Sequence, residues 1–134
     1  MMSPRVLVVM RDQWRRAVLR AALREVGYDA VGTRDGVEAL SVKTDAPDRG
    51  RVGLIIADQD SVTERAIAAL HDRNPAAPMV LLARATLEAP HGDWSRVLRR
   101  PFSIADVVTA TEELLPLQQS LRRPLDETRE DASR

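Results

Sequence analysis

Short runs of consecutive apolar residues constrain the fold of this chain more than any other feature. The clearest lie at 6–10, 52–57 and 79–83, where nearly every residue is Val, Leu, Ile, Met or Ala. Successive side chains of a strand point to opposite faces of a sheet, so a strand that is apolar throughout is covered on both faces, as in a parallel sheet. Weaker runs at 28–33 and 97–98 predict two further strands.

Apolar residues at three- and four-residue spacing predict helices between these strands, at 12–27, 63–73 and 103–115, with a shorter helix after Asp35. Residues 85–95 contain a proline, a glycine and a single large aliphatic residue, so the fourth helix is expected to be shortened or irregular. The alternation predicts an α/β fold, a doubly wound five-stranded parallel sheet with helices on both faces.

Two helix ends carry recognisable signals. Gly27 follows the first helical pattern and is expected to end it, because glycine readily adopts the left-handed conformation of a C-terminal cap. Ser103 and Asp106 have capping-box spacing at the start of the last helix.

The first helix has two distinct faces. Its apolar positions predict the buried face: Val18, Leu19, Ala22, Leu23 and Val26. Arg16, Arg20 and Arg24 fall opposite, and we interpret this arginine stripe as a solvated face, not as a nucleic-acid contact, since interleaved aromatic residues are lacking apart from Trp14.

Length and composition favour one globular domain. The chain has 134 residues, with 20 basic and 20 acidic side chains and no cysteine, which excludes a disulfide scaffold and a thiol enzyme. No apolar run approaches the roughly 20 residues of a membrane span, and the first residues lack the pattern of a signal peptide, so a cytoplasmic protein without membrane contact is expected. We expect a folded domain at 4–116 and a flexible tail at 117–134.

Ligands of parallel α/β sheets bind at the carboxyl ends of the strands, so the residues that follow the strands are the candidate site. They are Met10, Arg11, Asp12, Asp58, Ala83, Arg84, Arg99 and Arg100.

From Arg5 to about Leu115 the order and spacing of several motifs are similar to those of the receiver domain of two-component response regulators. The motifs are the strand-helix register from Val6 through Gly27-Tyr28, then Asp35-Gly36-x-Glu38-Ala39-Leu40, Leu54-Ile55-Ile56-Ala57-Asp58 and Arg100-Pro101-Phe102. The resemblance implies a flavodoxin-like fold and a role in signal transduction. It also implies a phosphorelay in which a histidine kinase phosphorylates an aspartate with the help of Mg²⁺.

The matching positions are only partly preserved. Asp58 stands at the phosphoacceptor position, but Met10 and Arg11 stand where the family has its acidic, metal-binding pair. Asp12 offers one carboxylate beside an arginine, a poor magnesium site. The switch positions are changed as well: the hydroxyl residue is Ala83, the aromatic residue is Val97 and the lysine is Arg100. We therefore expect a degenerate receiver with no cofactor and no metal.

Two interpretations of Asp58 follow from these replacements. In the first, the Arg11 guanidinium forms an internal salt bridge with Asp58 and locks one conformation. In the second, Arg11, Arg84 and Arg100 lie at one sheet edge and bind an anion or a nucleotide.

We expect a phosphorylation-independent protein-interaction module that is not an enzyme. Its partner would be a signalling protein, such as a histidine kinase or another regulator, and a homodimer is left open. The alternatives are a single-domain response regulator phosphorylated on Asp58 and an anion or nucleotide sensor. Trp14 and Trp94 are expected to pack against the rim of the core, and His71 and His91 to lie on the surface.

Overall fold

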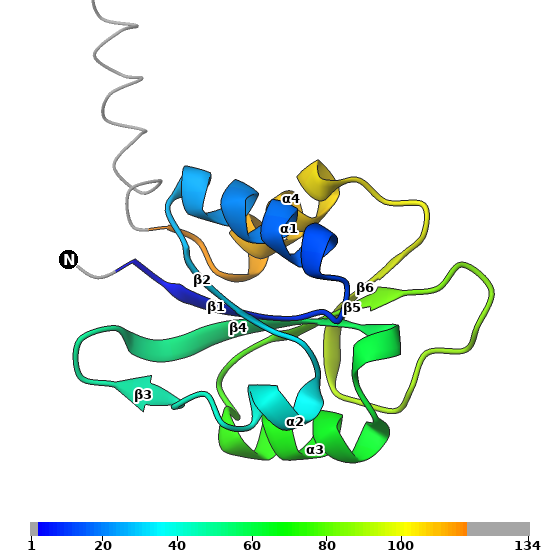
Figure 1. The fold of residues 1–134 in the computed structure, drawn as a ribbon, viewed down its shortest axis with the longest axis horizontal. Coiled ribbons are helices and arrows are strands. Elements are labelled where there is room, and N and C mark those ends of the chain that lie inside the picture. Colours follow the sequence, from blue (N-terminus) through cyan, green and yellow to red (C-terminus); the bar gives the residue numbers. More distant parts are fainter. Residues whose placement is uncertain (1–2, 118–134) are drawn as a thin grey trace, which may run out of the picture.

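The computed structural model describes residues 3–117, which form one sheet with helices on both faces (Figure 1). Five parallel strands lie in the order β2-β1-β4-β5-β6. Their bounds are β1 Arg5–Val9, β2 Asp29–Thr33, β4 Gly50–Asp58, β5 Met79–Ala83 and β6 Trp94–Arg99. The predicted five-stranded parallel sheet is confirmed. A two-residue strand that the sequence does not predict, β3 at Asp45–Ala46, pairs antiparallel with the start of β4.

The helices divide into two layers (Figure 1). Helices α1 (Gln13–Val26) and α4 (Ile104–Leu114) cover one face of the sheet, and α2 (Gly36–Ala39) and α3 (Glu64–Arg73) cover the other. A short 3₁₀ turn, η1 at Gln59–Ser61, joins β4 to α3. None of the helices in residues 3–117 is long and apolar enough to cross a membrane.

Both helix-end predictions are confirmed. Gly27 has a φ of 118°, a left-handed conformation that costs glycine little, and its N–H donates to the carbonyl of Arg24 at 3.1 Å. Ser103 and Asp106 form the reciprocal hydrogen bonds of a capping box at the start of α4.

The strand side chains alternate between two apolar clusters. Val8, Ile56 and Leu82 belong to the cluster under α1 and α4, whereas Val9 and Ile55 belong to the cluster over α3. All five are at most 2% exposed. A sheet covered on both faces explains why these strands are apolar at every position.

The predicted buried face of α1 is too wide. Leu19 and Leu23 are buried, but Val18 and Val26 are each 37% exposed. Helix α1 therefore meets the sheet along a narrow line, which leaves part of its apolar side uncovered.

The arginine stripe of α1 is only partly solvated: Arg24 is exposed, whereas Arg16 and Arg20 are half-buried. Arg20 Nε and Arg24 Nη2 donate to the carbonyl of Ala30 in the edge strand β2, at 3.2 and 3.3 Å, and Arg16 donates to the carbonyl of Met10. Gly32 explains the arrangement, because a Cβ there would lie only 2.7 Å from Cδ of Arg20. The missing side chain lets the arginine stems cross the strand.

The short helix expected at residues 85–95 does not form, and a loop joins β5 to β6 instead. Arg99 donates to the carbonyls of Arg84 and Leu87 at 3.1 and 2.8 Å. The His91 N–H donates to the Glu64 carboxylate of α3 at 2.6 Å. These bonds fix the loop without a helix.

The folded domain extends further than predicted. Leu117, which we expect in the tail, is 6% exposed and belongs to the core cluster under α1 and α4. The rest of the predicted tail, residues 118–134, lies outside the described residues.

Candidate functional site

Asp58 lies at the carboxyl edge of the sheet, as the last residue of β4. It is 7% exposed, since β4 lies between β1 and β5 and the turn η1 begins directly after it. A carboxylate at this depth needs partners, because burial penalises its charged form.

Two side chains supply those partners. Nη2 of Arg100 lies 3.2 Å from Oδ1 of Asp58, and the Ser61 hydroxyl donates to Oδ2 at 3.2 Å. Burial raises the pKa of Asp58 above its ordinary value, and the Arg100 charge opposes that rise in part. Asp58 is thus a restrained group, held from both of its oxygens.

The expected salt bridge between Arg11 and Asp58 is wrong. Within residues 3–117, Arg100 is the ion-pair partner of Asp58, and Arg11 takes part only through its backbone N–H, which donates to Ser61 Oγ at 2.8 Å. Met10 is buried, and the following residue points the other way, so the Arg11 side chain is exposed. Arg100, at the position of the family lysine, takes the role that we assign to Arg11.

The predicted anion site of three arginines is not assembled. Arg84 Nε forms an ion pair with Asp60 at 2.7 Å, and Arg100 is engaged with Asp58. Two of the three guanidinium groups are therefore already neutralised by carboxylates.

The residues at the carboxyl edge do not fit a magnesium ion. Magnesium prefers an octahedron of oxygen ligands, whereas Met10 offers a thioether. Asp12 caps α1 by accepting from the N–H of Arg15, and Asp60 pairs with Arg84. Between residues 3 and 117, no group of three or more His, Cys, Asp or Glu side chains is placed to hold a metal.

Of the three expected switch positions, Arg100 bonds to Asp58, whereas the side chains of Ala83 and Val97 carry no hydrogen-bonding group. Ala83 is fully buried and has no hydroxyl, although its carbonyl accepts from the Arg100 N–H at 3.1 Å. Val97 is 38% exposed on the edge strand β6. Neither side chain can report a change at Asp58 through a hydrogen bond.

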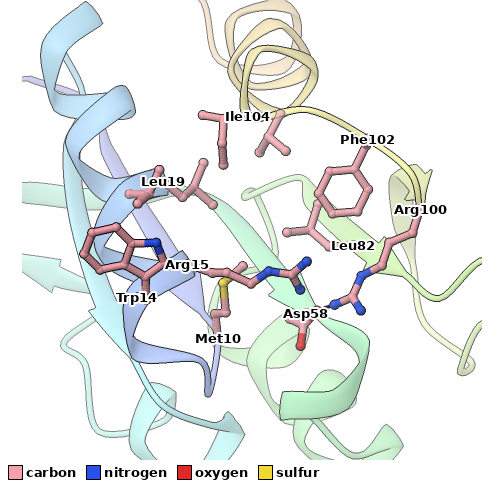
Figure 2. Close-up of a pocket in the computed structure, with 11 residues that line it drawn as sticks. Met10, Trp14, Arg15, Leu19, Asp58, Leu82, Arg100, Phe102 and Ile104 are labelled. Atoms are coloured by element: carbon pink, nitrogen blue, oxygen red, sulfur yellow. Dashed lines mark hydrogen bonds and ion pairs between the residues drawn. The ribbon is translucent and has the colours of Figure 1, made fainter.

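A pocket of about 230 Å³ opens beside Asp58, between α1 and the segment that joins β6 to α4 (Figure 2). Its walls are mainly apolar, from Met10, Leu19, Leu82, Phe102, Ile104 and Val107. Arg15 lines the pocket, and Figure 2 shows its guanidinium pointing over Asp58 toward Arg100. Arg15 is not among the site residues that we expect from the sequence. Its position in the first turn of the helix that follows β1 is the signal that could have suggested it.

The tryptophans and histidines differ from the expectation in one case. Trp14 is 77% exposed at the mouth of the pocket, so the prediction that it packs against the core is wrong. Trp94 does pack against the core, and its Nε1 donates to the carbonyl of Pro90 at 3.0 Å. His91 is exposed, and His71 lies 3.5 Å from the exposed Asp93 carboxylate.

No protein-family model and no curated protein matches the chain. Among solved structures, the signal receiver domain of an HD domain-containing protein from Pseudomonas fluorescens has a TM-score of 0.70 at 20% identity, over 84% of this chain and 94% of that one. The chain has the receiver fold. The same likeness holds for the chemotaxis protein CheY4 of Vibrio cholerae, with a TM-score of 0.68 at 19% identity, over 84% of this chain and 99% of that one.

A structure described as an adenylate cyclase from Rhodopirellula baltica is similar as well. It has a TM-score of 0.68 at 18% identity, over 96% of this chain and 98% of that one. At these identities the similarity concerns the receiver fold, and the chemistry at its carboxyl edge has to be argued from the residues of this chain.

Proposed function

We propose that this receiver-fold chain is a signalling module that acts through protein contacts and does not depend on phosphorylation of Asp58. The observation that carries the proposal is the environment of Asp58, whose two oxygens are engaged by Arg100 and Ser61 while Met10 and Arg11 stand at the metal-binding positions.

Phosphoryl transfer to a carboxylate brings negative charges together, and a metal ion normally neutralises them. Here a thioether and an exposed guanidinium replace the two carboxylates that would hold the ion. Arg100 supplies a positive charge, but it is already paired with the group that would have to attack. The edge therefore favours a restrained Asp58 carboxylate, held in an ion pair, over a reactive one.

The proposed partner is another protein of a cytoplasmic signalling pathway, such as a histidine kinase or a regulator, and the chain itself is not an enzyme. The absence of a phosphorylation switch means that binding would depend on the amount of each partner, not on the state of Asp58. A second copy of the chain is a further partner to test by measuring the molar mass in solution.

The decisive experiment incubates the chain with acetyl phosphate and Mg²⁺ and measures its intact mass. We expect no gain of a phosphoryl group in the native chain or in an Asp58→Asn control. A gain that is present in the native chain and absent in Asp58→Asn would instead establish an active response regulator.

A double variant tests the cause. The variant Met10→Asp with Arg11→Asp places a carboxylate at both positions where the family has its acidic pair. If the missing carboxylates are what prevents the reaction, this variant should gain Asp58-dependent phosphorylation in Mg²⁺.

A further inference from the structure

The pocket beside Asp58 has features of a ligand site that the proposed function does not use. It lies where α1 and the residues before α4 diverge, with Leu19 on one wall and Phe102 and Ile104 on the other (Figure 2). Trp14 stands at its mouth and is 77% exposed. An exposed tryptophan beside an apolar hollow leaves a large apolar surface in contact with water, which a ligand would cover.

The charges around the pocket do not balance. Asp58 and Arg100 neutralise one another at 3.2 Å. Arg15 is the third charged side chain of the lining, and within residues 3–117 its guanidinium has no ion-pair or hydrogen-bond partner. The pocket therefore carries one uncompensated positive charge.

Arg100 also keeps unused hydrogen-bonding capacity. Its Nη2 bonds to Asp58, whereas its Nη1 makes no hydrogen bond among the described residues. A guanidinium has five N–H donors in a planar fork, so a carboxylate could bridge Arg15 and Arg100 without displacing Asp58.

Size limits the ligand further. The pocket holds about 230 Å³, less than the roughly 300 Å³ at which sites for drug-sized ligands begin. A body of one aromatic ring or one branched alkyl chain fits this scale, with a short arm to carry the charge.

We propose that this pocket binds a small organic monoanion, an aryl- or alkyl-substituted carboxylic acid. Its apolar body lies between Leu19, Phe102 and Ile104, and its carboxylate meets Arg15 and Arg100. The site differs from the anion site expected from sequence, because Arg11 and Arg84 take no part and the walls are apolar. The binding proposal is argued from the pocket alone and does not rest on the proposed function.

Isothermal titration with matched acid and amide pairs tests the proposal: 3-phenylpropionate, indole-3-acetate and 4-methylpentanoate, each against its primary amide. The amide keeps the shape and removes the charge. We expect at least one acid to bind, and its amide to bind at least tenfold more weakly.

Arg15→Gln should lower the affinity for the acid about tenfold and abolish its preference over the amide. Arg15 is exposed, and its backbone N–H keeps the helix cap, so the variant retains the fold. Arg11→Gln is the matched control: it removes an exposed arginine at the same sheet edge, outside the pocket lining, and should leave the affinity unchanged.

Equal affinities for acid and amide, an affinity for the acid that survives Arg15→Gln, or absence of binding across the panel would each overturn the proposal. None of these results bears on phosphorylation of Asp58, so the two proposals fail separately.

Discussion

The central strands and the carboxyl edge of the sheet are built on different principles. In β1, β4 and β5 most side chains are buried apolar groups that contact other apolar groups. Other apolar side chains of similar shape could fill the same space. At the edge, single polar contacts such as that between Asp58 and Arg100 decide the arrangement. The strands can therefore preserve a receiver fold at about 20% identity while the chemistry at their ends changes.

The residues that we expect to depart from the receiver pattern lie at this edge. Met10 and Arg11, where we expect the acidic pair of the family, both follow β1, so the strand pairings of β1 do not depend on their identity. Stability and site chemistry can then be altered separately, which the following variants test.

The largest effect is expected in the central strands. Leu54 is fully buried in β4, and Leu54→Ala should lower the free energy of unfolding by about 2–5 kcal/mol, since it removes packed methyl groups and leaves a cavity. Chemical denaturation measures the change. Val37→Ala on α2, where the side chain is 79% exposed, is the control and should stay within about 0.5 kcal/mol. If Leu54→Ala lowers the free energy of unfolding as little as the control does, the packing of the central strands does not have the importance that we assign to it.

An intermediate effect is expected from Arg100→Met, which leaves the buried Asp58 carboxylate without its ion pair. The free energy of unfolding at pH 7 should fall by about 1–3 kcal/mol, the usual cost of an unpaired buried polar group. Arg84→Met breaks the more exposed pair with Asp60 and should cost at most about 1 kcal/mol. Equal losses in urea denaturation would show that burial does not distinguish the two pairs.

The smallest effect is expected from Asp58→Asn, and it depends on pH. Because the pKa of Asp58 is raised from 3.8 in the folded chain, the folded state holds this proton more tightly than the unfolded chain. Ionising Asp58 therefore costs stability as the pH rises above about 3.8. Asp58→Asn should be more stable than the native chain at pH 7, by about 1 kcal/mol or less.

The stability difference between the two chains should shrink as the pH falls toward 4. Thermal unfolding across this range measures it. A difference that stays constant with pH would mean that the folded chain does not raise the pKa of Asp58.

The sequence determined the features that depend on neighbours along the chain. The apolar runs predicted the five strands, the three- and four-residue spacing predicted α1, α3 and α4, and Gly27 and Ser103 marked helix ends. These signals are local, because strand and helix periodicities and caps are set by residues a few positions apart. The position of Asp58 at the end of a central strand followed from the same pattern.

Only the tertiary structure decided which polar groups meet. Asp58 pairs with Arg100, 42 residues away, and not with Arg11. The direction in which a side chain points just after a strand depends on the local path of the backbone, which the sequence pattern does not show. Arg20 reaches across β2 through the space at Gly32, and Arg15 extends over the pocket. An arginine side chain is long and flexible enough to reach several carboxylates and carbonyls, and only the packed arrangement of α1, β4 and the segment before α4 selects one.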